Sequence, residues 1–229
     1  MKIERIQTFQ RVDELSQVLL ERMVLTSRFN LEIPHQEAVM AITGALKAVV
    51  EQRRHKLILD DATVGHIAEV ARWLTDPNGK PSLLIGGGCG NGKTSMALAL
   101  KQLVEFVTEY ELGYDKRARM GMYTAQQICH LCSASERNRE AMQEYDSLFS
   151  RRMLIIDDLG EEPKELLIYG MVHTPVIDLL SQRYQNNQLT IITSNLQAAD
   201  IESRYGRRIR DRLREMAHTV VFANESYRR

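Results

Sequence analysis

The segment Gly87–Thr94, which reads Gly-Gly-Cys-Gly-Asn-Gly-Lys-Thr, constrains the fold of this chain more than any other feature of its sequence. An apolar run at residues 82–85 precedes it, and an apolar run with helical periodicity at about 94–110 follows it. This order predicts a strand, a tight loop and a helix. Glycines let successive backbone N–H groups turn inward without Cβ clashes, and the N-terminus of the following helix adds partial positive charge. The pattern G-x-x-x-x-G-K-[ST] in this setting therefore predicts a phosphate-binding loop.

The side chains at the end of this loop fit the chemistry of a nucleoside triphosphate. We expect Lys93 to bridge the β- and γ-phosphates and the hydroxyl of Thr94 to ligate Mg²⁺. Cys89 is interpreted as a small loop residue; the alternative is a redox switch, because a helix N-terminus lowers the pKa of a nearby thiol. A glycine-rich turn without a ligand is disfavoured by the strand and helix on either side. The expected nucleotide-binding residues are Gly87, Gly88, Cys89, Gly90, Asn91, Gly92, Lys93, Thr94 and Ser95.

Two carboxylates, Asp157 and Asp158, directly follow an apolar run at 153–156. Ligands of open α/β sheets lie beyond the carboxyl ends of the strands, so both side chains are expected to face the phosphates. We expect Asp157 to hold Mg²⁺, directly or through water, and Asp158 to polarise the attacking water as a general base. Asn195 ends a later apolar run and is expected to orient that water. The alternatives are a solvated turn for the acidic pair and an ordinary cap for Asn195.

Short apolar runs alternate with helical patterns through residues 79–229, which predicts a parallel sheet covered by helices on both faces. The strands are expected at 82–85, 121–124, 153–156, 189–193 and 219–222, and the main helices at 94–110, 125–133, 176–184 and 201–216. Earlier in the chain, apolar stripes at 12–23, 34–49 and 63–74 also predict helices. A cluster of helix breakers at 76–81 separates the two parts. We therefore predict a small helical N-terminal region, 1–78, and an α/β domain, 79–229.

The chain carries 30 basic and 30 acidic residues and has a net charge of zero, which excludes a uniformly basic nucleic-acid-binding protein. The charge is unevenly spread. Residues 81–200 have 11 basic and 15 acidic side chains, a net charge of −4, and residues 201–229 have 8 and 4, a net charge of +4. The C-terminal segment is therefore basic.

The cysteines and the apolar runs bear on the location of the protein. Three cysteines are too few for a disulfide framework. Cys129 and Cys132 form a single C-x-x-C pair, which supplies too few ligands for a structural zinc site and favours packed cysteines. The sequence has neither an 18-residue apolar run nor the features of a signal peptide. We therefore expect a cytoplasmic protein without a membrane span.

Six arginines and one aspartate lie within residues 204–214. On a continuous helix Arg204, Arg208 and Arg212 would line one face. The run is interpreted as a solvated helix face or as a contact for a nucleic-acid backbone. A third interpretation is that it supplies an arginine that acts on the γ-phosphate bound by a neighbouring subunit. The residues alone leave these three interpretations open.

The order of the phosphate loop, LIIDD at 154–158, ITSN at 192–195 and YGRRIRDRL at 205–213 resembles that of AAA+ ATPases. More narrowly, residues 80–229 resemble the group of DnaC-type replicative helicase loaders and IstB-type transposition helpers. The resemblance implies a three-layer P-loop NTPase fold with a five-stranded parallel sheet. It implies that Arg212 is an arginine finger acting on the ATP of a neighbouring subunit and that Arg228 is a sensor-like arginine. It also implies Walker A residues Gly87, Gly92, Lys93 and Thr94, Walker B residues Asp157 and Asp158, and sensor 1 at Asn195.

The same resemblance implies a function. It implies binding of ATP and Mg²⁺, ATP hydrolysis, a homo-oligomer that forms on ATP binding, and a helicase-loader-like role with single-stranded DNA and a replicative helicase as partners. The alternatives are an IstB-like helper that acts with a transposase, and a nucleotide-gated binding module that hydrolyses little ATP. Asp158 stands where many AAA+ proteins have glutamate, so slow hydrolysis is expected, and the usual C-terminal helical lid is expected to be missing. A small-molecule kinase is disfavoured, because nothing in the sequence supplies an acceptor pocket.

Overall fold

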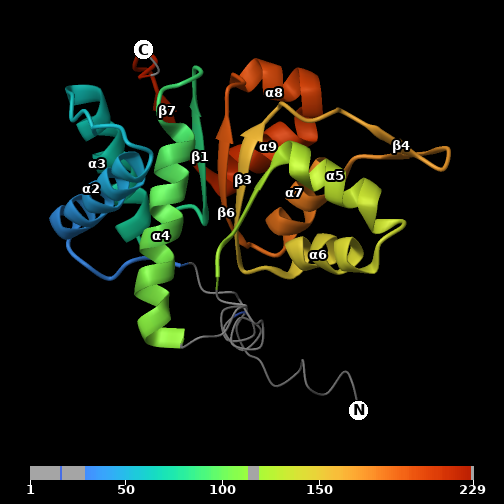
Figure 1. Ribbon diagram of the computed structural model, residues 1–229, viewed down its shortest axis with the longest axis horizontal. Helices are drawn as coiled ribbons and strands as arrows, with labels where there is room; N and C mark the ends of the chain where they lie inside the picture. The colour runs from blue at the N-terminus through green and yellow to red at the C-terminus, as the bar shows by residue number, and fades with distance from the viewer. Residues whose placement is uncertain (1–15, 17–28, 113–118, 228–229) are drawn as a thin grey trace.

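The computed structural model of the chain describes residues 16, 29–112 and 119–227. Its centre is a five-stranded sheet in the order β2-β3-β6-β1-β7 (Figure 1), in which every neighbouring pair of strands is parallel. The predicted five-stranded parallel sheet is therefore confirmed. Its strands are β1 Ser82–Gly87, β2 Gly121–Thr124, β3 Met153–Leu159, β6 Leu189–Ser194 and β7 Ala217–Phe222.

Helices cover both faces of the sheet, because successive side chains of each strand point to opposite faces and both faces are apolar. Leu83 and Ile85 of β1 lie in the core beneath α2, α3 and α4, whereas Leu84 between them lies in the core beneath the remaining helices. This is the predicted three-layer α/β architecture (Figure 1). Within the described ranges, no helix combines the length and the apolar character that crossing a membrane requires. The helices are α2 His35–Gln52, α3 Asp61–Thr75, α4 Lys93–Leu112, α5 Ala125–Ser135, α6 Arg139–Ser150, α7 Pro175–Gln185, α8 Ala198–Tyr205 and α9 Arg207–Met216.

The N-terminal helices α2 and α3 share one continuous core with α4 and the sheet. α3 begins where the side chain of Asp60 accepts the Thr63 N–H, an N-cap, and its Trp73 is 3% exposed. The helices expected at 34–49 and 63–74 are confirmed. The helix expected at 12–23 lies, except for residue 16, outside the described residues. The division of the chain at residue 78 stays a prediction.

Two features of the second half differ from the expectation. The prediction of a single helix at 201–216 is wrong, because the structure has two helices there. Gly206, with φ of +84°, is the residue at which α8 ends and α9 begins. A glycine adopts this left-handed conformation without the strain that a side chain adds. Residues after β3 also form an antiparallel hairpin that was not predicted, β4 Leu166–Ile168 and β5 Met171–His173. Helix α6 was not predicted as a separate element either.

Arg183 of α7 is completely buried and joins three parts of the structure. Its Nε donates to the Thr190 hydroxyl at 2.8 Å. The guanidinium also donates to the backbone carbonyls of Leu148 (3.2 Å), Arg151 (2.9 Å) and Leu189 (2.7 Å). Burial lowers the pKa of this side chain, and the four acceptors offset the cost of desolvation. Arg183 therefore ties α7 to β6 and to the connection between α6 and β3.

Candidate functional site

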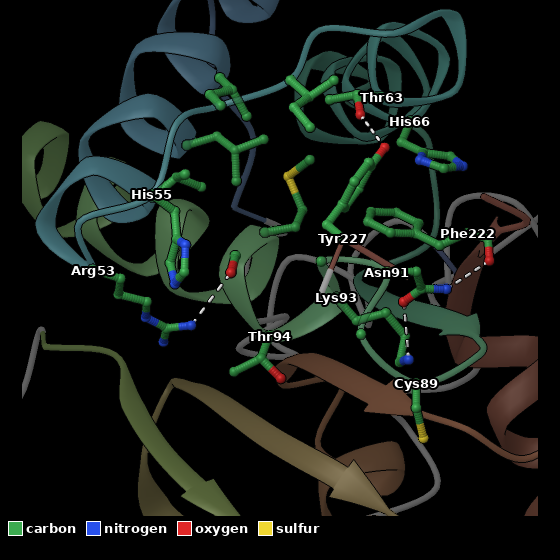
Figure 2. Close-up of a pocket in the computed structure, with 18 of the residues that line it drawn as sticks. Arg53, His55, Thr63, His66, Cys89, Asn91, Lys93, Thr94, Phe222 and Tyr227 are labelled. Atoms are coloured by element: carbon green, nitrogen blue, oxygen red, sulfur yellow. Dashed lines mark hydrogen bonds between the residues drawn. The ribbon is translucent and has the colours of Figure 1, made fainter. Parts of the chain in front are cut away.

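A pocket of about 980 Å³ lies where the carboxyl ends of β1, β3 and β6 approach α2 and α3. The phosphate loop forms its floor, Asp158 and Asn195 lie on one side, and the last turn of α2 and the first turns of α3 lie on the other. Figure 2 shows residues of the phosphate loop, of α3 and of the segment after α2 around one space. The structure therefore brings the predicted loop, acidic and sensor residues together, and it adds a wall from the N-terminal helices.

The phosphate loop holds Lys93 in a fixed position. Its ammonium donates to the backbone carbonyls of Gly87 at 2.9 Å and Gly88 at 2.6 Å, and to Asn91 Oδ1 at 3.1 Å. The side chain is only 5% exposed. The loop thus orients the lysine through its own acceptors.

Gly87 and Asn91 join the loop to the end of β7. Gly87 has φ of +136°, and a Cβ there would lie 2.3 Å from the carbonyl oxygen of Phe222. The side chain of Asn91 is buried and donates to that same carbonyl at 2.7 Å (Figure 2). Asn91 therefore stabilises the loop through its side chain, and only glycine fits at position 87.

Helix α4 begins at Lys93, the last part of the loop. The N–H groups of its first turn have no intrahelical acceptor, and Lys93, Thr94 and Ser95 all line the pocket. Backbone donors at a helix N-terminus bind anions. The floor of the pocket therefore offers what phosphate groups need.

Asp157 is the centre of a hydrogen-bonded cluster at the ends of β3 and β6. The Thr94 hydroxyl donates to its carboxylate at 3.1 Å, and the Thr193 hydroxyl donates to the same oxygen at 2.5 Å. Thr193 in turn accepts the backbone N–H of Asp158 at 2.9 Å. Asp157 is 4% exposed. The sequence includes Thr193 only as part of the ITSN segment at 192–195, and the structure makes it the link between the two aspartates.

Asp158, Glu161 and Asn195 line the same side of the pocket. Asp158 has φ of +54°, a conformation that is rare outside glycine. The Asn195 amide donates to Glu161 Oε1 at 3.4 Å. Glu161 was not predicted as a site residue; its position three residues after Asp158 is the only signal that the sequence contains.

The opposite wall is aromatic and was not predicted. The rings of His66 and Phe222 stack with centroids 4.0 Å apart and planes 5° from parallel. The Tyr227 hydroxyl lies 2.7 Å from the Thr63 hydroxyl and donates to the Asp60 carboxylate at 3.0 Å. Burial lowers the pKa of His66. A flat apolar wall of this kind suits a nucleotide base.

The C-terminal segment is attached to the phosphate loop. The backbone N–H of Tyr227 donates to the Gly90 carbonyl at 2.9 Å, and the Asn224 amide donates to the Asn91 carbonyl at 3.3 Å. The next residue, Arg228, lies outside the described residues, so its expected role stays a prediction. The segment before it reaches the pocket.

Arg204 lies on α8, whereas Arg208 and Arg212 lie on α9. Arg204 donates to the carbonyl of Glu162, and the guanidinium of Arg212 lies 5.2 Å from the centre of the Tyr184 ring. Arg208 is exposed. The single face expected for these three arginines is therefore wrong, because Gly206 breaks the helix. Among the described residues that line the pocket, none comes from α8 or α9.

The three cysteines occupy two environments. Cys89 is exposed and lines the pocket. Cys129 and Cys132 are buried on α5, and burial raises the pKa of the Cys129 thiol to about 11. In the described part of the chain, no three His, Cys, Asp or Glu side chains gather as a metal-binding group.

Comparison with known proteins supports the sequence resemblance. The model of a family described as IstB-like ATP binding protein matches residues 58–229. A comparison with curated proteins finds no match. The solved structure of the DnaC helicase loader is 21% identical with a TM-score of 0.53, over 71% of this chain and 90% of that chain. The structure of DnaI is 19% identical with a TM-score of 0.55, over 81% of this chain and 93% of that chain. At these identities the structures establish a common fold, and the family match covers the whole pocket except the lining residues between 46 and 57.

Proposed function

The chain belongs to the family of IstB-like ATP-binding proteins, and we propose that it hydrolyses ATP, assembles with copies of itself and acts on a replicative helicase with single-stranded DNA. The family supports ATP binding in this pocket. The observation that carries the proposal of hydrolysis is the 3.1 Å contact between the Thr94 hydroxyl and the Asp157 carboxylate. It joins the end of the phosphate loop to the first residue of the acidic pair.

Mg²⁺ fits the residues at this contact. The Thr94 hydroxyl at the start of α4 and the Asp157 carboxylate near the end of β3 are hard oxygen ligands, which Mg²⁺ prefers together with water and phosphate oxygens. Thr94 and Asp157 would hold the ion, and Thr193 keeps the Asp157 carboxylate oriented through the 2.5 Å hydrogen bond. When bound, Mg²⁺ supplies neutralising charge at the β- and γ-phosphate oxygens.

Hydrolysis would use Asp158 and Asn195 at the side of the pocket. The oxygen of a water forms a bond to the γ-phosphorus, the bond from that phosphorus to the β-phosphate oxygen breaks, and ADP and phosphate leave. Asp158 would accept a proton from the attacking water, and Asn195 would orient that water without adding charge. Lys93 would stabilise the charge that develops on the phosphate oxygens.

Arg212 would complete the site of a neighbouring subunit. Its helix does not contribute to the described pocket of its own chain, which is the arrangement that a finger acting in trans requires. An arginine supplied by a neighbour stabilises the transition-state charge of phosphoryl transfer. Assembly on ATP binding would follow, because both the nucleotide and the finger occupy the subunit interface.

The role with DNA and a helicase rests on charge and on likeness. Residues 201–229 carry 8 basic and 4 acidic side chains, and Arg207 and Arg208 are exposed on α9. Guanidinium groups suit a phosphate backbone. The DnaC structure, which shares this fold, is that of a helicase loader.

The family match favours a second candidate, an ATP-dependent transposition helper whose partner is a transposase. The short side chain of Asp158 favours a third, a nucleotide-gated module with slow turnover. A pull-down with and without ATP, scored for a replicative helicase against a transposase, separates the first two. Steady-state ATPase measurement with and without single-stranded DNA tests the third.

The sharpest test of the mechanism mixes two inactive variants. Asp158→Asn keeps the finger but lacks the base, and Arg212→Ala keeps the base but lacks the finger. Each variant alone is expected to be inactive, and an equimolar mixture is expected to regain ATPase activity, because some interfaces then combine an intact site with an intact finger. A mixture as inactive as its components, or an Arg212→Ala variant with wild-type turnover, would contradict action in trans.

A further inference from the structure

Arg53 reaches the phosphate-binding helix from a part of the chain to which the sequence assigned no nucleotide contact. It is the C-cap residue of α2, and its Nη1 donates to the Ser95 hydroxyl in the first turn of α4 at 3.4 Å (Figure 2). The two residues are 42 positions apart. Figure 2 shows the guanidinium directed toward the pocket floor, on the side opposite Tyr227.

The charges of the pocket are separated. Arg53 and Lys56, both basic, line it on the α2 side together with His55. Asp158 and Glu161, both acidic, line it on the opposite side. A Mg²⁺-bound nucleotide matches this separation, because its metal lies toward the carboxylates and its remaining phosphate charge requires cations.

Arg53 is available for such a contact. In the described part of the chain its guanidinium forms no ion pair with a carboxylate, and the residue is exposed. Its partner is the hydroxyl of Ser95, a neutral group that a phosphate oxygen can replace or share. Arginine presents a planar fork of donors that matches two phosphate oxygens.

The order of residues along α4 indicates which phosphate it meets. Thr94 contacts Asp157 and marks the metal end of the pocket. Met96, with Leu46 and Val50 of α2, contributes an apolar lining that, together with the aromatic wall described above, suits the nucleoside. Ser95 lies between these two ends. A cation beside Ser95 is therefore closest to the phosphate next to the nucleoside.

We propose that Arg53 binds the α-phosphate of the nucleotide, so that the segment after α2 is part of the nucleotide site. This rests on the nucleotide binding of the proposed function and adds a residue outside the segment that the family model matches. It also gives α2 a direct contact with the bound nucleotide.

Titration calorimetry of the full chain with ADP, AMP and adenosine tests the proposal. Arg53→Gln is expected to raise the dissociation constants of ADP and AMP by about tenfold, the loss of one charge-assisted hydrogen bond, and to leave adenosine binding unchanged. Arg54→Gln is the matched control: the residue is adjacent, exposed and equally charged but does not line the pocket, and its effect is expected to stay below about twofold.

Two results would overturn the proposal. The first is that Arg53→Gln and Arg54→Gln bind ADP and AMP with equal dissociation constants. The second is that Arg53→Gln weakens adenosine binding as much as it weakens ADP and AMP binding, which would make Arg53 part of the wall of the base site. A wild-type chain that binds none of the three compounds would instead refute the proposed function, and the inference with it. The wild-type measurement therefore distinguishes the two failures.

Discussion

The hydroxyl of Thr193 donates a hydrogen bond of 2.5 Å to the carboxylate of Asp157, from the end of β6 to the end of β3. The hydroxyl oxygen of Thr193 also accepts the backbone N–H of Asp158 at 2.9 Å. Thr193→Val keeps the shape of the side chain and removes both interactions. Because groups that orient a metal ligand support metal affinity and activity, we expect the ATPase rate to fall about 10- to 100-fold at low Mg²⁺. Steady-state ATPase measurement over a Mg²⁺ series checks this.

Thr193→Ser is the control. Because it keeps the hydroxyl, it is expected to retain most of the wild-type ATPase activity. Nucleotide binding in the presence of a chelator should be similar in all three proteins, because Thr193 does not line the pocket. A Val variant with the Mg²⁺ dependence of the wild type would show that the hydrogen bond has no role in metal binding.

Gly87 and Gly88 are adjacent but differ in what a side chain would meet. A Cβ on Gly87 would lie 2.3 Å from the Phe222 carbonyl oxygen, whereas a Cβ on Gly88 has no atom within 4 Å. We expect Gly87→Ala to lower the free energy of unfolding by about 3 kcal/mol and to abolish ADP binding. Gly88→Ala, the matched control, should retain its stability. Urea unfolding and calorimetry measure both; equal effects of the two substitutions would contradict the steric argument.

Arg183 allows a direct test of a buried cation that, within the described ranges, has hydroxyl and carbonyl acceptors and no carboxylate partner. Arg183→Met keeps the aliphatic part of the side chain and leaves the carbonyls of Leu148, Arg151 and Leu189 without this donor. We expect a loss of about 3 kcal/mol in the free energy of unfolding. Arg152→Met, on the exposed neighbour of Arg151, is the control, with an expected change of less than about 0.5 kcal/mol. If Arg183→Met were as stable as this control, the hydrogen bonds of the Arg183 guanidinium would make no contribution to the free energy of unfolding.

Features that depend on consecutive residues were predictable from the sequence. The phosphate loop, the apolar strands and the carboxylates after β3 each depend on a few neighbouring residues, and the sheet brings the strand ends together. The fold was therefore predicted correctly down to its five parallel strands. The break at Gly206 also had a visible signal, a glycine inside a helical pattern, but the regular spacing of the arginines obscured it.

The remaining wall of the pocket was not predictable in this way. Thr63 and Tyr227, whose hydroxyls lie 2.7 Å apart there, are 164 positions apart, and Arg53 and His66 belong to a region without a recognisable motif. Only the packing of α2 and α3 against α4 and β7 brings these residues to the nucleotide site. Long-range contacts of this kind leave no periodic pattern in a single sequence.

His66 makes the stability of this wall dependent on pH. Its ring stacks on Phe222 with centroids 4.0 Å apart, and burial lowers its pKa below the ordinary value of 6.5, although Asp60 and a hydrogen bond to Val221 oppose the shift. The unfolded chain therefore binds the proton more readily than the folded chain. The contribution of His66 to the free energy of unfolding is thus present above about pH 6.5 and is lost as the pH falls through the folded-state pKa.

We expect the free energy of unfolding, from urea titrations between about pH 7.5 and 5.5, to fall less steeply in His66→Phe than in the wild type. His130→Phe, on the exposed side of α5, is the control and should keep the wild-type slope. Equal slopes in the wild type and His66→Phe would assign the pH dependence to other groups.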